Sequence, residues 1–326
     1  MTLLKDQVQA KSTGPSPRAA ELALLFATLV WGSSFTWAKA SGDAINRITG
    51  AGQNAMAGPA MLMAARFMLA GALWMIAFPQ ARRGWTRVGL MRGALLGLLV
   101  GTGLILQVLG LDRTTEAVSA FLTSLTILWV PAIMTLWMRK PPTPIFWAGV
   151  VLAGCGIWLM TGAMPAGFGR GEVLGLACSI AFSFHIIALN AIVPRENAWR
   201  MTGMQLLVAG ALAAVFAIAV GGWGSRTVEA FADGSVSVNL VLLILFPTFI
   251  SFGIMSYFQP AVDASRATLI YLMEPIFAAA YAWMSIGRRL GPVELFGAAL
   301  ILAANVLVEV LAARSRKTGE GADATE

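Results

Sequence analysis

Residues 269–283 read LIYLMEPIFAAAYAW, an apolar run interrupted by one glutamate and one proline. A helix that crosses a hydrocarbon layer of about 30 Å needs about 20 apolar residues. A carboxylate inside such a helix costs roughly 2.5–3.5 kcal/mol on insertion scales, so Glu274 must face protein or water. Pro275 has no N–H, so the carbonyl of Tyr271 loses its helical partner and we expect a bend. The stretch therefore predicts a membrane helix whose interruption lies away from lipid.

The composition of the whole chain agrees with lipid as its solvent. Of 326 residues, 58% are hydrophobic and only 12% are charged, whereas soluble domains carry about 25% charged residues. The net charge of +7 comes from short basic clusters between apolar runs, so we expect no nucleic-acid partner. One histidine and two cysteines in apolar stretches predict neither a metal nor another cofactor.

Ten segments are long and apolar enough to cross a bilayer, which predicts an all-α integral membrane protein. With the N-terminus inside, fifteen lysines and arginines fall in inside segments, seven in outside segments, and Arg66 within a span. The positive-inside rule then places both termini in the cytoplasm and the protein in the cell inner membrane. The expected spans are 21–40, 59–79, 91–111, 114–138, 145–162, 171–193, 201–221, 239–258, 266–286 and 291–312.

The ten spans divide into two similar sets of five. Residues 120–149 align without a gap to 268–297, so that Thr126 is the counterpart of Glu274, and 66–74 resembles 205–213. An odd number of spans per repeat forces the second copy to be inverted, a common plan in secondary transporters. We divide the chain into a cytoplasmic tail (1–20), two five-span repeats (21–163 and 171–312) and a second cytoplasmic tail (313–326). Residues 1–18 and 314–326 are polar and are expected to be disordered.

Glycines recur every fourth residue in the third expected span, at Gly93, Gly97 and Gly101. Such spacing predicts a smooth helix face for close packing. No Walker pattern occurs anywhere in the chain, so we do not expect direct coupling to ATP.

Three stretches together resemble the drug/metabolite transporter superfamily, EamA type. They are WGSSFTWAKA (31–40), LDRTTEAVSAFLTSL (111–125) and LMEPIFAAAYAW (272–283). The resemblance covers about residues 21–312 and implies ten spans in two inverted five-helix repeats, but it implies no particular substrate. The ninth span of that family usually ends in Gly-Glu-Arg-Leu, whereas this chain has Arg288 in place of the acid.

Ionisable and polar residues inside the spans are the candidates for transport. At 100° per residue, Tyr271, Glu274, Ala278 and Tyr281 share a narrow stripe, and Arg66 is expected to face inward as either a partner of Glu274 or a ligand for an anionic group. Glu274 and His185 are the candidates for proton coupling. A structural role remains the alternative for each. The expected substrate-binding residues are Trp31, Ser34, Arg66, Ser179, Ser183, Gln205, Tyr271, Glu274 and Tyr281.

The sequence therefore predicts a secondary active transporter that moves small polar metabolites, such as amino acids or their analogues, by efflux or exchange. Its expected partners are a small-molecule substrate, the lipid bilayer and protons, and the expected assembly is a monomer or weak dimer. Uptake of a larger nucleotide-like or vitamin substrate is the alternative within the class. Long soluble loops would favour a non-transporting assembly or regulatory protein, and all the expected loops are short. A membrane enzyme would need a nucleophile with its base, and the sequence shows no such pair.

Overall fold

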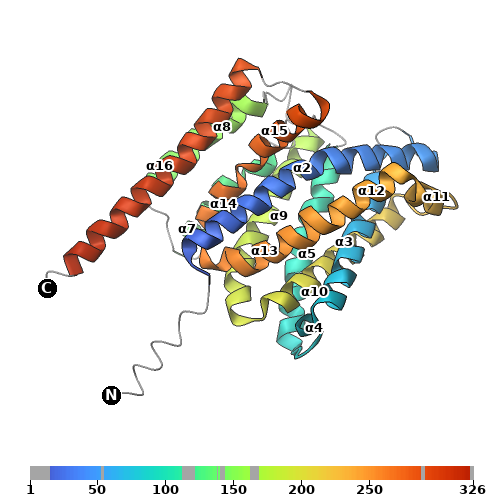
Figure 1. Cartoon of the computed structure of the whole chain (residues 1–326), viewed down its shortest axis with the longest axis horizontal. Helices are drawn as coiled ribbons and strands as arrows, with labels where there is room; N and C mark the ends of the chain where they lie inside the picture. The colour runs from blue at the N-terminus through green and yellow to red at the C-terminus, as the bar shows by residue number, and fades with distance from the viewer. Residues whose placement is uncertain are drawn as a thin grey trace.

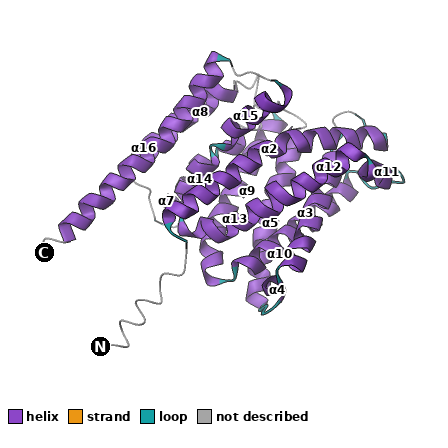
Figure 2. Ribbon diagram, viewed as in Figure 1, coloured by secondary structure: helices purple, strands orange, loops and turns teal. Residues whose placement is uncertain are grey.

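The structure is a computed structural model that describes residues 15–52, 55–111, 122–137, 139, 144–161, 169–287 and 291–323. Within these ranges all regular elements are helices (Figure 2). The first half holds α2 (Pro17–Thr49), α3 (Ala57–Ala77), α4 (Pro79–Arg82), α5 (Arg87–Leu111), α7 (Thr126–Leu136) and α8 (Pro144–Thr161). The second half begins with α9 (Arg170–Ile192), η1 (Val193–Arg195), α10 (Ala198–Ala219), α11 (Thr227–Ala232) and α12 (Gly234–Leu243). It continues with η2 (Ile244–Ile250), α13 (Ser251–Phe258), η3 (Gln259–Ala261), α14 (Ala264–Tyr271), α15 (Glu274–Ile286) and α16 (Pro292–Asp323).

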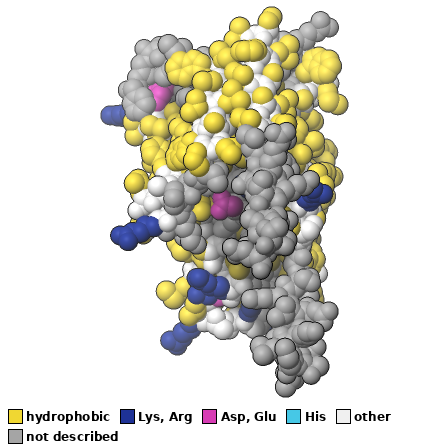
Figure 3. All heavy atoms as spheres, turned by 90° about the vertical axis from the view of Figure 1, so that its left-hand side faces the viewer, with side chains coloured by type: hydrophobic (Ala, Val, Ile, Leu, Met, Phe, Trp, Pro, Cys, Tyr) yellow, Lys and Arg dark blue, Asp and Glu magenta, His cyan; other side chains and the backbone are white. Residues whose placement is uncertain are grey.

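Seven of the described helical segments are long and apolar enough to cross a membrane. The other three expected spans coincide with shorter apolar helices at Leu122–Leu136, Pro144–Leu159 and Pro292–Val308. Figure 3 shows hydrophobic side chains gathered over the upper part of the face it draws, with lysine and arginine side chains at its sides and lower part. Such a surface suits lipid, and the chain is a multi-pass membrane protein.

The ninth span has its expected position, and Leu272 and Met273 separate α14 from α15 within it, beside the expected bend at Pro275. One expectation about the chain termini was wrong. The C-terminal tail is not disordered up to residue 323, because α16 runs from Pro292 to Asp323. A helix that has already formed extends at little cost, and alanine, arginine and lysine after residue 311 are good helix formers. Residues 1–14 and 324–326 lie outside the described residues.

The helix contacts made by the first half have counterparts made by the equivalent helices of the second half. Helix α5 packs on α9 as α13 packs on α2, and α7 packs on α9 as α15 packs on α2. The pairs α3–α10 and α8–α16 each join equivalent spans of the two halves. Figure 1 shows α8 and α16 side by side at one edge of the molecule. They reach the rest of the bundle through a core that includes Ile127, Leu269 and Leu272.

The fourth and ninth spans are interrupted at positions that the ungapped alignment pairs. In the first half, the Leu125 N–H donates to Leu122 O at 3.2 Å and the Trp129 N–H to Leu125 O at 3.1 Å. In the second half, the Met273 N–H donates to Ile270 O at 3.1 Å and the Phe277 N–H to Met273 O at 3.1 Å. The same two hydrogen bonds thus bridge both breaks, which supports the alignment of 120–149 with 268–297.

The predicted glycine face of α5 packs directly on α10. A Cβ on Gly97 would lie 2.6 Å from the Val208 Cβ and 2.9 Å from the backbone oxygen of Gln205. Gly93 and Gly101 meet Met204 and Ala209 in the same way. The prediction from the four-residue spacing is confirmed, and the close contact brings α10 and its Gln205 into the interior.

We expect Gly97→Ala to destabilise the protein by about 1–3 kcal/mol, because the added methyl group meets backbone that cannot rotate away. The measurement is the thermal unfolding midpoint of the full chain in detergent. Gly154→Ala in α8 is the matched control, since a Cβ there has nothing within 4 Å. Equal midpoints for the two variants would contradict the close α5–α10 contact.

Candidate functional site

The eighth span contains a π-helical segment, η2, built around Pro247. The Ser251 N–H points to the carbonyls of Phe246 and Thr248, so it does not take the Pro247 carbonyl that a regular α-helix would offer it. The Trp31 indole N–H donates to this carbonyl at 2.8 Å. A side chain from the first span therefore satisfies a backbone group that the π segment leaves open.

Arg66 is anchored to the same segment. Its Nε–H donates to Thr248 Oγ1 at 2.5 Å, and the Thr248 hydroxyl donates to Leu243 O at 2.7 Å. The guanidinium carbon also lies 5.3 Å from the ring centroid of Phe67. Arg66 is the tenth of the 21 residues of α3, so this cation lies at the middle of its span.

Glu274 begins α15 directly after the break in the ninth span. It is the eleventh of 22 residues in the span Ala264–Ser285, so it lies at about the same depth as Arg66. A carboxylate in the first turn of a helix faces the positive end of the helix dipole. The break therefore gives Glu274 a more favourable place at half-depth than the interior of a continuous helix would.

Arg66 and Glu274 are half-buried and close enough for their charges to attract each other. They do not form a direct ion pair. The two Nη groups of Arg66 and the carboxylate of Glu274 make no side-chain hydrogen bond within the described part of the chain. Two opposite charges are thus held at the same depth with hydrogen-bonding capacity left over.

Aromatic rings on the helices of the site pack against one another. The Trp31 ring meets Tyr271 edge-on at 5.5 Å and Phe252 at 5.9 Å, and Trp37 meets Tyr281 at 5.7 Å. Helix α15 approaches α2 closely at Gly32. A Cβ on Gly32 would lie 2.7 Å from the backbone nitrogen of Ala278 and 2.8 Å from the Phe277 Cβ. The expected small notch at Ala278 accordingly faces the first span.

Tyr271 does not share one regular stripe with Glu274, because the helix breaks between them. The Tyr271 hydroxyl donates to Gln259 Oε1 at 2.7 Å. The Gln259 amide donates to Ile186 O at 3.0 Å and to Asn190 Oδ1, and the Asn190 amide donates to Val262 O at 2.7 Å. This network joins the break to the end of α9.

The predicted residues of the sixth and seventh spans lie in a second buried polar cluster. His185 Nε2 is 2.9 Å from Gln205 Oε1, and the Gln205 amide donates to Ser256 Oγ at 2.8 Å. Both His185 and Gln205 are buried. Their side chains are engaged with each other in this conformation, which is the structural role that was the alternative for His185.

Of the three predicted serines, Ser179 and Ser183 lie on α9 and Ser34 lies on α2. Ser179 and Ser183 are fully buried, and their hydroxyls donate to the Leu176 and Ser179 carbonyls at 2.8 and 2.7 Å. Ser179 also accepts the Trp129 indole N–H at 3.0 Å. Ser34 is half-buried on α2, about one turn beyond Trp31. Only Ser34 therefore lies on the helix that carries Trp31.

Two residues of the site, Pro247 and Thr248, were missed by the sequence analysis. The signal was present in LILFPTFI (243–250), where a proline interrupts an apolar run as Pro275 does in the ninth span. Most of the motif 111–125 and the substituted acid at Arg288 lie outside the described residues.

The bundle of apolar helices is that of a multi-pass membrane protein with charged groups at half-depth. The chain belongs to the EamA-like transporter family, whose profile matches residues 18–162 and again residues 169–310. It is 26% identical over 302 residues to an uncharacterized transporter of Archaeoglobus fulgidus, covering 93% of this chain and 89% of that protein. A protein of known crystal structure has the same fold, with a TM-score of 0.71 at 20% identity over 91% of this chain and 98% of that one.

We expect Trp31→Phe to lower stability by about 1–3 kcal/mol, because it leaves the buried Pro247 carbonyl without its donor. The measurement is the unfolding midpoint in detergent. Trp37→Phe is the matched control: the same change six residues further along α2 removes an indole N–H that donates to no described residue. A larger loss for Trp37→Phe would contradict the role of the Trp31 hydrogen bond.

Proposed function

We propose that the chain is a secondary active transporter that moves small polar metabolites, namely amino acids or their analogues, across the cell inner membrane by alternating access. It works by efflux or exchange, with both termini in the cytoplasm. Membership of the EamA-like family supports transport, and the half-buried charges at mid-span support a polar substrate. In secondary transporters, substrates bind near the midplane between repeats, where interrupted helices leave polar groups available.

The observation that carries the substrate class is the separation of Arg66 from Glu274. The scaffold anchors each one, Arg66 on Thr248 and Glu274 at the start of α15, without letting them pair directly. We propose that a molecule with a carboxylate and an ammonium group binds between them. The planar guanidinium binds a carboxylate through two parallel hydrogen bonds, and the glutamate accepts from the ammonium.

Glu274 is also the proposed proton-coupling residue. A carboxylate at half-depth is costly when no cation neutralises it, so it either takes a proton or holds a cationic group. When the substrate leaves, Glu274 takes up a proton in place of the substrate ammonium, and this exchange couples transport to the proton gradient. His185 is the second proton candidate, and its engagement with Gln205 gives it the smaller part in the proposal.

We expect Arg66→Gln to lower amino-acid counterflow in proteoliposomes at least tenfold, because hydrogen bonds to a charged group contribute roughly 1.5–3 kcal/mol. Arg66→Lys keeps the charge without the planar fork and should recover only part of the flux. In the wild type, an amino-acid amide should compete more weakly than the free acid. Equal competition by the two would contradict recognition of the carboxylate.

We expect Glu274→Gln to insert normally, to transport poorly, and to lose the dependence of flux on an imposed proton gradient. The control is Glu229→Gln, at an exposed carboxylate whose pKa is held down by hydrogen bonds from Arg226. Flux and its pH dependence should be unchanged there. Normal transport by Glu274→Gln at several pH values would rule out proton coupling through this residue.

A further inference from the structure

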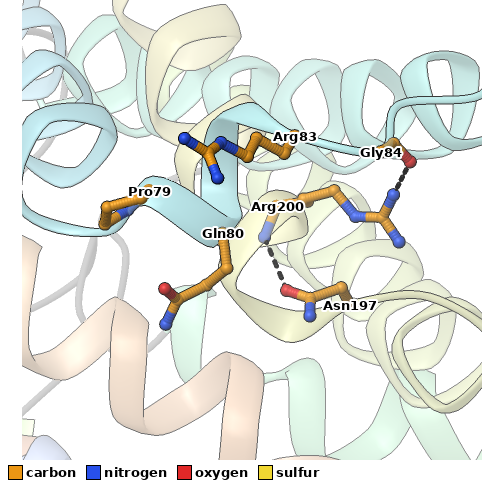
Figure 4. Close-up of a pocket in the computed structure, with 6 residues that line it drawn as sticks. All are labelled: Pro79, Gln80, Arg83, Gly84, Asn197 and Arg200. Atoms are coloured by element: carbon orange, nitrogen blue, oxygen red, sulfur yellow. Dashed lines mark hydrogen bonds between the residues drawn. The ribbon is translucent and has the colours of Figure 1, made fainter.

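A basic pocket lies where the connection between α3 and α5 meets the start of α10. Its volume is about 490 Å³, and Pro79, Gln80, Arg83, Gly84, Asn197 and Arg200 line it. Figure 4 shows the side chains of Arg83 and Arg200 extending in opposite directions, with Arg200 donating to the Gly84 carbonyl and with Gln80 and Asn197 beside them. The pocket is separate from the site around Arg66 and Glu274 and shares no residue with it.

The charge around the pocket is strongly positive. Residues 78–92 and 193–200 carry six arginines and a single carboxylate, Glu196. Arg92 pairs with Glu196 at 2.9 Å, and Arg200 is 4.0 Å from the same carboxylate. Arg83 is exposed and has no ion pair with a described residue. The pocket therefore carries positive charge at Arg83 that no carboxylate among the described residues neutralises.

An apolar groove of about 320 Å³ adjoins the basic pocket. Its lining includes Phe78, Ala198 and Trp199, which are sequence neighbours of residues in the basic pocket, together with Trp74, Phe249 and Tyr257. The Trp74 indole N–H is already used, since it donates to Trp199 O at 2.8 Å. Tyr257 at the groove is 45% exposed. Tryptophan and tyrosine gather at the level where acyl chains meet headgroups.

We propose that the two adjoining cavities bind one anionic phospholipid, with its phosphate at Arg83 and part of an acyl chain in the aromatic groove. Basic pockets between membrane helices bind anionic headgroups. A small soluble anion would use Arg83 and leave the groove empty, whereas an apolar molecule would leave the positive charge unmatched. A phospholipid matches both features. The proposal does not depend on which substrate is transported.

The test measures lipid binding to the full chain in detergent after endogenous lipid has been removed. Phosphatidylglycerol and phosphatidylcholine with identical acyl chains are titrated, and the bound lipid is followed by native mass spectrometry. We expect phosphatidylglycerol to bind at least about fivefold more tightly, and Arg83→Gln to weaken it about fivefold. Arg87→Gln removes an exposed arginine at the start of α5, outside the pocket, and should leave the affinity unchanged.

A second variant tests the groove. Ala198→Leu places a larger side chain in the groove and should weaken both lipids while leaving the preference for phosphatidylglycerol. Equal affinity of the wild type for the two lipids would overturn the proposal, as would equal weakening by Arg83→Gln and Arg87→Gln, which indicates a diffuse lipid shell. Binding of glycerol phosphate as tight as that of phosphatidylglycerol would also overturn it, since the pocket would then be a solute site.

Discussion

The hydrogen bond from the Trp31 indole to the Pro247 carbonyl shows the constraint on which the site depends. In hydrocarbon, a backbone polar group that loses its helical partner must find another inside the protein. In the eighth span the π segment leaves the Pro247 carbonyl without a helical donor, and in the ninth span Pro275 offers no N–H to the Tyr271 carbonyl. The first half of the chain supplies the replacement at Pro247, so the irregular segment and the packing of the two halves stabilise each other.

The same constraint explains why charged groups gather at this place. An interrupted helix offers a helix terminus and an irregular carbonyl where a regular span would offer only side chains, and both stabilise charge. Glu274 uses the terminus, and Arg66 uses the hydroxyl that the π segment presents on Thr248. The cost of a charge at half-depth is lowered by these groups and by the opposite charge nearby. Backbone irregularity and charge are therefore two parts of one arrangement.

The sequence was informative where the order of residue types along the chain decides whether a segment lies in lipid, packs on another helix or is interrupted. Apolar runs located the helices, the glycine spacing of α5 predicted its contact with α10, and Pro275 predicted an interruption beside Glu274. The expected position of Tyr271 on the stripe of Glu274 was wrong, because it assumed a continuous helix through residues 272 and 273. The hydrogen-bond partners of Arg66 and Trp31 could not be predicted from the sequence. They depend on a π register around Pro247 that appears only when the first, second and eighth spans pack together.

The two halves share a scaffold but not its chemistry. The breaks at Leu125 and Met273 are bridged by matching hydrogen bonds, yet the residue after the break is Thr126 in one half and Glu274 in the other. The counterpart of Arg66 is Gln205, which is buried and engaged with His185 and Ser256. Arg66 and Glu274 thus carry opposite charges with spare hydrogen-bonding capacity, whereas their counterparts Gln205 and Thr126 are neutral. The opposite charges of the proposed site therefore come from the residue types at equivalent positions and not from a difference in the helical scaffold.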